Sequence, residues 1–404
     1  MIDHLDIEAS GRPRLTKTRT IGRTYAFIIG AVLCVVLIGI SSSDWGFPRE
    51  ELPFGEIARA RGRTATGVKF YLYSDLDWMS MTCNDGVLVD ELVKPQRDGF
   101  PFKHTDDYWF LKAALHHPWR VSDPEEADLF VVPALLNFPM EQISFSRRQC
   151  CVGDLCNAEL FRYTDTMLAQ SPWFKRYGGK DHVAVCSHYG CPGQLALWRN
   201  IQACNTISFE ENSMRGDRCR IATTYVGRAC VGAPSEHGNS TAIARQDTFV
   251  MVASMHPERP SFRQRGEFCE WAKSASRVGP YNVSQCGPGP QCPAVAQAQF
   301  GFHIRGDTLG SNRLMDYILS GTVPVFTDER QYDILLPFVP WRNLSVLINA
   351  RDKDEFLDAV GRVVPQYETV KATLDFFAPL LRWETPAPFE QYMQLFQFCS
   401  PRHK

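Results

Sequence analysis

The fold of this chain is decided by one stretch, FGFHIRGDTLGSNRLMDYILSGTVPVFTD, which occupies residues 300–328. It begins with an apolar run at 300–304, which is typical of a buried strand. The next residues, RGDTLG at 305–310, contain two glycines and predict a turn. A second apolar run, VPVF at 323–326, predicts another strand.

A helix is predicted between these two runs, because its ends and its faces are marked in the sequence. Ser311 or Asn312 can cap its start, and Gly321 is a natural residue just beyond its end at Ser320. Its apolar side chains fall on one stripe and its polar side chains on another. The whole stretch therefore predicts a compact βαβ unit.

The glycine turn and the start of this helix form a place that favours an anion. Free backbone N–H groups and the dipole at a helix start both attract negative charge, such as a diphosphate. Arg313 opposes that dipole unless a negative group lies nearby, and Asp316 could accept hydrogen bonds from ribose hydroxyls. The stretch has neither a Walker A loop nor a G-x-G-x-x-G fingerprint. From spacing alone, a structural βαβ unit with a solvated polar face is an equal alternative.

The rest of the chain alternates between predicted strands and helices. Strands are predicted at residues 68–73, 127–132, 182–186 and 248–253. Helices are predicted at residues 107–116, 157–169, 352–364 and 365–381. This alternation predicts an α/β fold with parallel sheets. The length of 404 residues favours two domains, and the polar stretch at 232–242 is the best candidate for a linker.

Composition excludes several classes of protein. Hydrophobic residues at 44% and charged residues at 22% are ordinary values for a globular chain. Aromatic residues at 12% do not suit a disordered chain. A net charge of −2 gives no electrostatic reason to expect a nucleic-acid partner.

The N-terminus has the pattern of a membrane anchor. Residues 1–24 contain a run of basic residues, and residues 25–43 contain no charge and are long enough to cross a thin bilayer. The basic flank predicts that residues 1–24 are cytosolic. Residues 44–66 would then form a lumenal stem, and the rest of the chain a lumenal body. A cleaved signal peptide is the alternative. Sequons that agree with a lumenal body lie at Asn239, Asn282 and Asn343.

The fourteen cysteines also fit a lumenal body. Several lie close together in the sequence: Cys150, Cys151 and Cys156; Cys186 and Cys191; Cys286 and Cys292. In a cytosolic protein such groups would suggest zinc, with His188 as a further ligand, but in an oxidising lumen disulfides are the better interpretation. We expect Cys286 and Cys292 to staple a Gly/Pro-rich surface loop at 278–293. Cys34 lies in the apolar segment, and an odd count remains, so at least one other cysteine is unpaired or intermolecular.

The stretch at residues 302–338 resembles the signature of the exostosin family of glycosyltransferases. That signature contains Gly-Asp-Thr, a Ser-x-Arg-Leu helix start, an acidic residue three positions after the Arg, then Gly-x-x-Pro-Val and Leu-Pro-Phe. This sequence has these elements at 306–308, 311–314, 316, 321–325 and 336–338. Two further stretches are similar to the family, EADLFVVP at 126–133 and WFKRYGGKDHVAVCSHYG at 173–190.

The similar stretches follow the family's order, and the resemblance covers roughly residues 68–375. The sequence departs from the family pattern at two positions: Lys180 stands where Arg is usual, and Tyr189 where Asp is usual. Residues 192–230 have no recognisable counterpart. These differences concern the acceptor more than the reaction.

The resemblance implies a GT-B fold, in which two Rossmann-like domains face each other across a cleft. The N-terminal domain, at 67–235, would hold the acceptor, and the C-terminal domain, at 240–375, would bind a nucleotide-diphosphate sugar, most often UDP-linked. Residues 376–404 would form a helical tail. The expected function is inverting transfer of a sugar to a glycan or glycoprotein acceptor, with the short single anchor favouring a type II position in the Golgi membrane.

Inversion by direct displacement needs a base for the acceptor hydroxyl and positive charge or dipoles for the leaving diphosphate. The resemblance and their position beside one predicted strand place the base among Asp181, His182 and His188, without a choice between them. Donor contacts are expected from Arg305, Gly306, Asp307, Ser311, Arg313 and Asp316. Phosphate or acceptor contacts are expected from Arg176 and Arg265.

No metal or other cofactor is expected, because GT-B sites usually dispense with a metal. Asp75 and Asp77 form an Asp-x-Asp pair after a predicted strand, and residues 352–354 repeat the pattern. Such a pair binds a metal in GT-A transferases, but the exostosin-like motifs outweigh it. The alternative function is a non-catalytic subunit that stabilises an active partner, in a hetero- or homodimer.

Overall fold

The computed structural model describes residues 67–83, 86–94, 102–140, 149–213, 218–230, 245, 247–337 and 339–403. These residues belong to one compact unit, at 66–404. The predicted membrane segment at 25–43 and the predicted linker at 232–242 lie outside the described residues. Among the described residues, no helix combines the length and the apolar character needed to span a bilayer.

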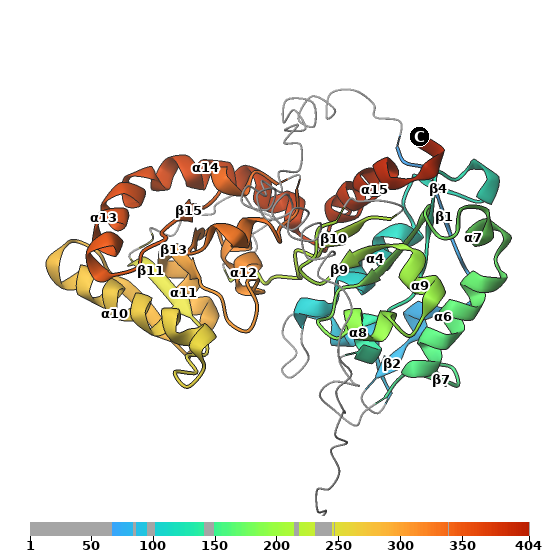
Figure 1. The fold of residues 1–404 in the computed structure, drawn as a ribbon, viewed down its shortest axis with the longest axis horizontal. Helices are drawn as coiled ribbons and strands as arrows, with labels where there is room; N and C mark the ends of the chain where they lie inside the picture. The colour runs from blue at the N-terminus through green and yellow to red at the C-terminus, as the bar shows by residue number, and fades with distance from the viewer. Residues whose placement is uncertain are drawn as a thin grey trace, which may run out of the picture. The chain divides into compact units, whose positions relative to one another are not determined.

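The first sheet contains parallel strands in the order β10-β9-β8-β5-β1-β4 (Figure 1). Their bounds are β1 Phe70–Leu72, β4 Arg120–Val121, β5 Leu129–Val131, β8 His182–Cys186, β9 Asn205–Ser208 and β10 Arg220–Ala222. Every residue of β8 is buried, which is the property expected of a central parallel strand. The strands predicted at 68–73, 127–132 and 182–186 are therefore confirmed.

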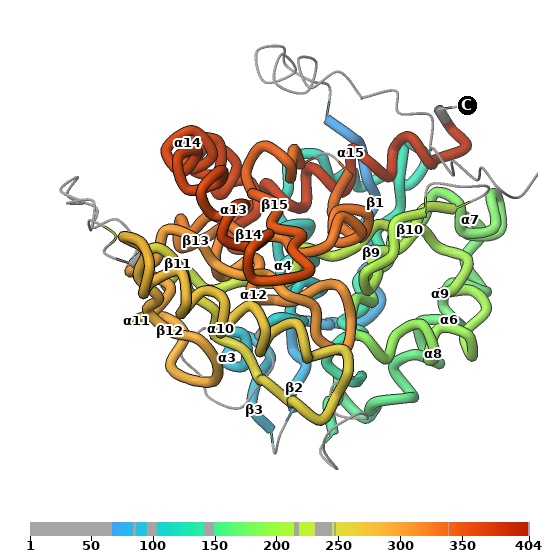
Figure 2. The backbone as a smooth tube through the Cα atoms, turned by 60° about the vertical axis from the view of Figure 1, so that its left-hand side comes forward, coloured from blue at the N-terminus to red at the C-terminus, as the bar shows by residue number. Residues whose placement is uncertain are grey.

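Successive side chains of a strand point to opposite faces of a sheet. Helices cover both faces of the first sheet. The helices concerned are α4 Asp106–Leu115, α6 Ala158–Gln170, α7 Pro172–Tyr177 and α15 Ala387–Cys399. Phe70 and Phe110 both pack against Phe389 of α15, with ring centroids 5.2 and 4.7 Å away. On the other face, His182 lies against Phe174 of α7. The C-terminal helix α15 thus runs beside β1 and α4 (Figure 2).

The second sheet is also parallel, in the order β12-β11-β13-β14-β15. Its strands are β11 Asp247–Val252, β12 Val283–Gly287, β13 Ala298–His303, β14 Val323–Phe326 and β15 Val346–Leu347. Its helices are α10 Arg263–Val278, α11 Gln291–Gln297, α12 Arg313–Leu319, α13 Lys353–Val363 and α14 Tyr367–Phe377. Phe302 packs against Phe268 of α10 and Phe356 of α13, whereas Gly301 faces Tyr317 of α12. A side chain at Gly301 would collide with that tyrosine ring.

The decisive stretch forms the predicted βαβ unit. β13 and β14 are adjacent and parallel, and α12 connects them. Gly321 has a φ of +70°, a conformation that glycine adopts without strain just beyond a helix end. Asn312 occupies the N-cap position of α12, but its side chain makes no capping hydrogen bond. The helices predicted at 107–116, 157–169, 352–364 and 365–381 are confirmed as well, each with small shifts at its ends.

A small antiparallel sheet, β3-β2-β6-β7, was not predicted. Its strands are β2 Thr82–Cys83, β3 Val87–Leu88, β6 Cys150–Val152 and β7 Leu155–Cys156. Disulfides Cys83–Cys150 and Cys151–Cys156 join its strands. The short helices α3 Val89–Leu92, α8 Cys191–Leu195 and α9 Arg199–Ala203 complete the helices used below.

Six disulfides pair the cysteines of the described residues, and only Cys204 among those residues is left free and buried. The disulfide interpretation is therefore confirmed over zinc. The predicted Cys286–Cys292 staple is wrong: Cys286 pairs with Cys269, and Cys292 with Cys230. Residues 283–287 are not loop but strand β12, which lies beside α10 and so brings Cys286 to a helix cysteine.

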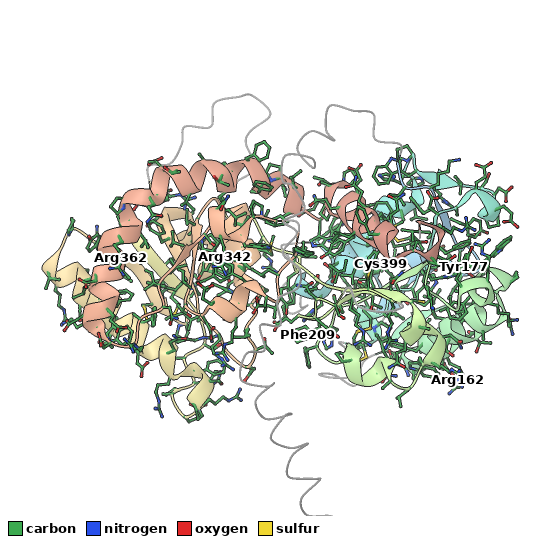
Figure 3. All side chains as sticks on the ribbon, turned by 45° about the horizontal axis from the view of Figure 1, so that its top comes forward. Arg162, Tyr177, Phe209, Arg342, Arg362 and Cys399 are labelled. Atoms are coloured by element: carbon green, nitrogen blue, oxygen red, sulfur yellow. A yellow bond between two sulfur atoms is a disulfide. The ribbon has the colours of Figure 1, made fainter. Side chains whose placement is uncertain are left out.

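The predicted C-terminal tail is tied to the first sheet. A disulfide joins Cys399, at the end of α15, to Cys219, next to β10. Figure 3 shows Cys399 among the side chains that surround the first sheet, together with Tyr177 and Arg162. The chain thus returns to its first sheet after completing its second.

Candidate functional site

The three predicted base residues lie at the two ends of β8. Asp181 and His182 are at its amino end, and His188 follows its carboxyl end. Six residues of extended chain span about 20 Å. The structure therefore does not bring the trio together, and they cannot act jointly on one hydroxyl group.

Asp181 and His182 are completely buried, and their polar atoms are used within the protein. His182 Nδ1 lies 2.8 Å from Asp181 Oδ1, and His182 Nε2 lies 2.8 Å from the Tyr73 hydroxyl. Burial lowers the pKa of His182, against the opposing effect of the Asp181 carboxylate. This pair orders the interior beneath α7, and in this arrangement it offers no face to an acceptor.

Arg176, predicted as a phosphate or acceptor contact, belongs to the same cluster. Its Nη2 lies 3.5 Å from Asp181 Oδ2, and its guanidinium lies over the Trp173 ring at 5.2 Å. It therefore stabilises the amino end of β8 and lies beside neither His188 nor the glycine turn.

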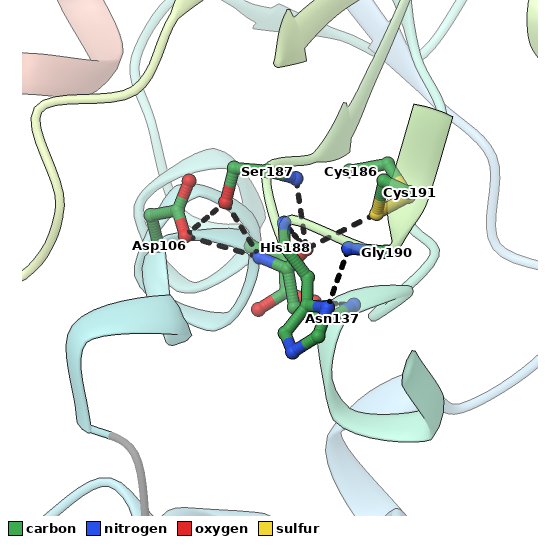
Figure 4. Close-up of a disulfide and its surroundings, with 8 residues drawn as sticks. Asp106, Asn137, Cys186, Ser187, His188, Gly190 and Cys191 are labelled. Carbon is green, nitrogen blue, oxygen red and sulfur yellow. Dashed lines mark hydrogen bonds between the residues drawn. A yellow bond between two sulfur atoms is a disulfide. The ribbon is translucent and has the colours of Figure 1, made fainter. Parts of the chain in front are cut away.

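His188 belongs to a hydrogen-bonded network at the carboxyl end of β8 (Figure 4). Its ring Nδ1 accepts a hydrogen bond from the Gly190 N–H at 3.0 Å, and its own backbone N–H donates to Asn137 Oδ1. A neutral imidazole whose Nδ1 accepts carries its proton on Nε2. His188 is fully buried, so in this arrangement its ring belongs to the interior network and offers no open face to an acceptor.

Buried polar groups hold this carboxyl end in place. Asp106 accepts hydrogen bonds from the Ser187 hydroxyl at 2.7 Å, from Asn137 Nδ2 and from the Thr223 hydroxyl. Burial raises the pKa of Asp106 to about 6, and the Ser187 and Thr223 hydrogen bonds act in the opposite direction. The Cys186–Cys191 disulfide closes the same segment.

The RGDTLG turn directly follows β13, with Arg265 beneath it. Arg265 is 4% exposed, and its guanidinium donates to the carbonyl oxygens of Ser254, Ile304 and Arg305. It thereby clamps the segments that leave β11 and β13. Its pKa falls to about 10, first because of burial and then because Arg313 is nearby. Arg265, predicted as a phosphate or acceptor contact, thus supports the turn from beneath.

Further positive charge surrounds the turn. Arg305 Nε is buried and has no hydrogen-bond partner among the described residues, and Arg313 Nη1 donates to the Ser311 hydroxyl at 2.8 Å. His303, at the end of β13, is buried with both ring nitrogens unpartnered there as well. Burial, with Arg313 and Arg265 adding to it, lowers the pKa of His303 to about 3, so this ring is neutral. The positive charges around the turn repel one another, and a bound anion would reduce that repulsion.

Gly306 and Asp307 form the surface of the turn. A Cβ at Gly306 would lie 2.5 Å from an Arg265 Nη2, so the clamp requires glycine there. Asp307 is exposed and pairs with Arg259 at 3.1 Å. Ser311, Arg313, Gly306 and Asp307 are thus gathered around one turn, as predicted from their spacing in the sequence.

Asp316 faces the protein in this structure. Its Oδ1 accepts from the Arg228 backbone N–H at 2.6 Å, and its Oδ2 accepts from Gln291 Nε2 at 2.5 Å. One turn later, the Ser320 hydroxyl accepts from the Cys230 N–H. The polar stripe of α12 therefore binds the segment at 228–230, and burial raises the pKa of Asp316.

Glu210 connects the exit of β9 to the glycine turn. Its Oε1 accepts hydrogen bonds from the Tyr225 hydroxyl at 3.0 Å and from the Thr308 hydroxyl at 2.9 Å. Gly310 lies so close that a Cβ there would come within 2.2 Å of the same oxygen. Glu210, Tyr225 and Gly310 line one pocket, so a carboxylate from the first sheet reaches the turn of the second.

On the side of the first sheet, Tyr225 joins this carboxylate to a cluster of aromatic rings. His104 and His188 lie 4.8 Å apart, Tyr189 lies 4.1 Å from His188, and Tyr225 lies 5.5 Å from His104. Tyr189 is 42% exposed. Both ring nitrogens of His104 are buried without a partner among the described residues. The cluster presents the exposed Tyr189 ring at the edge where β8 and β9 end, with the histidine rings buried behind it.

Among the described residues, no group of three or more acidic, histidine or cysteine side chains could hold a metal. Asp75, from the Asp-x-Asp pair, accepts a hydrogen bond from the Tyr163 hydroxyl at 2.5 Å. The cysteines near His188 are used in a disulfide.

Glu210, Tyr225, His104 and His303 are the functional candidates that sequence reasoning missed. His303 ends an apolar strand within the decisive stretch, which is a signal that the sequence contains. Glu210 and Tyr225 lie in the region at 192–230 without a recognisable counterpart, and only the packing of two sheets in one unit brings them to the turn.

Comparison with known protein families gives a match over most of the chain. The profile of the exostosin GT47 domain matches residues 67–363. No curated protein sequence matches the chain significantly.

Solved structures resemble the chain only distantly. A mutant of the Thermobaculum terrenum O-GlcNAc transferase is 10% identical, with a TM-score of 0.39 over 83% of this chain and 68% of that one. TarM is 10% identical, with a TM-score of 0.32 and 61% of each chain covered, so this chain spans about three fifths of it. Sucrose-phosphate synthase from Thermosynechococcus elongatus is 10% identical, with a TM-score of 0.27 and 67% of each chain covered.

Proposed function

This chain belongs to the exostosin GT47 family of glycosyltransferases, and from that premise we propose that it transfers a sugar, with inversion, from a UDP-linked donor to a glycan acceptor. The observation that carries the proposal is the cationic glycine turn after β13, with the Glu210 carboxylate held against it. Such a pairing of positive charge with a separate carboxylate suits displacement of a diphosphate.

The donor diphosphate binds at the RGDTLG turn in this proposal. Arg305 and Arg313 supply charge that Arg265, buried beneath, reinforces. Like charges in a partly buried place repel one another, and a bound diphosphate would replace that repulsion with attraction. The neutral His303 ring adds no charge of its own and could donate from one ring nitrogen.

Glu210 is the proposed proton acceptor. The acceptor hydroxyl oxygen attacks the anomeric carbon as the bond from that carbon to the diphosphate oxygen breaks. The hydroxyl proton passes to the Glu210 carboxylate, and UDP leaves with its negative charge beside the arginines. Both of these hydrogen bonds end on Glu210 Oε1, and Oε2 accepts none within the described residues. Asp181, His182 and His188, all fully buried, take no direct part here.

The acceptor glycan lies against the aromatic cluster at the ends of β8 and β9 in this proposal. Tyr189, whose ring packs on the buried His188 ring, offers an exposed ring for the apolar face of a sugar. This arrangement corresponds to the GT-B plan, with acceptor on the first sheet and donor on the second.

The setting of the reaction is part of the proposal. A lumenal body anchored in the Golgi membrane through residues 25–43 is supported by six disulfides and by the exposure of Asn282 and Asn343 in two sequons. Transfer would proceed without a metal ion.

A non-catalytic subunit in a hetero- or homodimer is the second candidate function. It is favoured by Asp316, whose two carboxylate oxygens are filled by protein donors and not left for a ribose. In that case the chain would bind a partner transferase and show no turnover of its own.

The test is a UDP-sugar panel applied to the full-length chain, with transfer to glycan acceptors and release of UDP both measured. We expect one donor to be used, and Arg313→Ala to reduce its use by about 10²-fold or more. Donor binding without turnover, restored by a co-purifying partner, would favour the subunit function. A folded chain that bound no nucleotide sugar would contradict the transfer proposal, and one that also bound no partner transferase would contradict both.

A further inference from the structure

We infer that a groove between the first sheet and helices α6 and α7 is a binding site for a neutral glycan chain. The groove is lined by Tyr71, Tyr73, Asp75, Tyr163, Gln170 and Trp173, among others, and has a volume of about 470 Å³. That volume falls within the range of ordinary ligand sites, about 300–1,000 Å³. None of these residues belongs to the glycine turn or to the Glu210 pocket, so the inference goes beyond the proposed transfer.

Aromatic rings form the walls of this groove and keep part of their surface exposed. Tyr71, Tyr73, Tyr163 and Trp173 are all only half-buried. Exposed aromatic faces carry negative partial charge, and the axial C–H groups of a pyranose ring carry positive partial charge. Stacking between the two is the usual way in which a flat apolar surface binds a sugar while its hydroxyl groups stay in water.

Polar groups in the groove match the hydroxyl groups of a sugar. The Asp75 carboxylate can accept two or more hydrogen bonds, and it already accepts one from the Tyr163 hydroxyl. Gln170 and Thr166 lie on α6 and are exposed. A carboxylate and an amide beside aromatic rings can bind neighbouring hydroxyl groups in a way that a purely apolar groove cannot.

The charge of the lining selects among possible glycans. It contains one carboxylate, Asp75, and neither lysine nor arginine. A sulfated or uronic-acid glycan, or a phosphate, would be repelled by Asp75 within the groove, because the neighbouring cations Arg176 and Lys175 lie beside the lining and not in it. A neutral glycan avoids that cost, so the ligand class is an uncharged oligosaccharide.

The groove is held rigid from beneath by the Asp181–His182 pair. His182 bonds the Tyr73 hydroxyl at 2.8 Å, and the same hydroxyl lies 2.8 Å from the Ser171 hydroxyl. The guanidinium of Arg176 lies over a second ring of the groove, that of Trp173. Rings fixed before binding lose little entropy when a ligand arrives. This gives Asp181 and His182 a role as positioning residues for Tyr73, away from the chemistry.

The experiment measures oligosaccharide binding to the full-length chain in detergent without nucleotide sugar. The probes are neutral hexasaccharides, such as cellohexaose, xylohexaose and maltohexaose, and a heparin hexasaccharide as the charged comparison. We expect at least one neutral hexasaccharide to bind saturably and the heparin hexasaccharide to bind more weakly.

Substitutions of groove residues test whether the hexasaccharide binds in the groove. Three single variants are compared: Trp173→Ala, Asp75→Ala and Tyr163→Phe. Each should weaken hexasaccharide binding by about tenfold, the scale of one aromatic contact or one hydrogen bond to a charged group. Phe398→Ala, at a ring 65% exposed on α15, is the matched control and should leave binding unchanged. Thermal unfolding curves identify any variant that fails to fold, and Asp75→Ala, at an exposed site, carries the test in that case.

The inference is overturned if no neutral hexasaccharide binds, if the groove variants bind as the wild type does, or if the heparin hexasaccharide binds better. UDP-sugar binding measured on the same samples separates the two proposals. Donor binding that persists while hexasaccharide binding is absent would remove the groove and leave the proposed transfer untouched.

Discussion

At the scale of single residues, two side chains beside the glycine turn occupy backbone conformations that cost energy. Glu210 has a φ of 43° and Tyr225 a φ of 58°, and the two are hydrogen-bonded to each other. A residue other than glycine in this region costs roughly 1–3 kcal/mol, and such residues cluster at functional sites. Their pairing next to Thr308 is what distinguishes Glu210 from the exposed acidic residues elsewhere in the described chain.

Replacing Glu210 by glutamine tests its role as proton acceptor. Glu210→Gln keeps the size of the side chain and an oxygen for Tyr225 and Thr308, but removes the basic group. We expect kcat for sugar transfer to fall by about 10²–10⁴-fold, the usual contribution of a general base, with donor affinity nearly unchanged. The measurement is steady-state transfer at saturating donor, beside donor binding by calorimetry.

The adjacent Glu211 provides the control. It pairs with Arg220 at 2.9 Å and makes no contact with the turn among the described residues. Glu211→Gln should transfer sugar at close to the wild-type rate. Equal losses in the two variants would contradict the assignment.

Asp106 makes the stability of the first sheet dependent on pH. Its pKa in the folded protein is raised by burial from 3.8 to about 6, so the folded state binds the proton more tightly than the unfolded state. Stability from this group is therefore fully present below about pH 4 and is lost as pH rises through 6. The difference amounts to roughly 3 kcal/mol between those limits.

Asp106→Asn removes this titration. The free energy of unfolding of the wild type, relative to the variant, should increase as the pH is lowered from 7 to 4, as measured by urea unfolding at each pH. A difference that stays constant over that range would show that Asp106 does not titrate there.

At the scale of elements, the RGDTLG turn requires small residues where it meets the first sheet. Gly310→Ala would bring a Cβ to 2.2 Å from Glu210 Oε1. The end of a glutamate side chain can swing aside, so we expect the fold to survive within about 1 kcal/mol while transfer falls as strongly as in Glu210→Gln. Thermal unfolding and transfer rates on one preparation check both parts.

Gly266 in α10 is the matched glycine, because nothing lies within 4 Å of a Cβ added there. Gly266→Ala should raise stability by about 0.5–1 kcal/mol and leave transfer unchanged. If Gly310→Ala behaved in the same way, the close contact between the turn and Glu210 would have no part in the reaction.

At the scale of the whole molecule, the chain closes on itself through α15. The Cys219–Cys399 disulfide joins positions 180 residues apart, and the hydroxyl of Tyr392 donates to the Ala222 carbonyl oxygen in the same region. Cys219→Ala combined with Cys399→Ala should lower the free energy of unfolding by about 5 kcal/mol, because the disulfide restricts a long loop of the unfolded chain. Urea unfolding of the oxidised proteins measures this.

The short Cys151–Cys156 disulfide is the comparison, with a separation of five residues. Its removal should cost about 2 kcal/mol on the same reasoning. If the two double variants lost equal stability, the long connection between α15 and β10 would not restrict the unfolded chain as argued.

Much of each half could be predicted from local sequence. The runs at 182–186 and 323–326 are strands with the predicted bounds, because continuous apolar and β-branched residues suit a central parallel strand. Residues 305–313 lie around one turn, as their closeness in sequence predicts. The strand β12 was missed, because its residues are interrupted by polar side chains at the edge of a sheet.

The sequence by itself determined the βαβ unit at 300–328, the parallel α/β class and the family, because these depend on periodicity and on residues within a few positions of one another. Tertiary structure alone decided which disulfides form, which carboxylate reaches the glycine turn, and that Asp181 and His182 lie buried away from it. The physical reason is that contacts such as Glu210–Thr308 and Cys219–Cys399 join positions about 100 to 180 residues apart, and only the packing of the two sheets brings them within bonding distance. The stretch at 300–328 therefore supplies the glycine turn, and residues far from it in sequence, such as Glu210, supply the side chains that contact the turn.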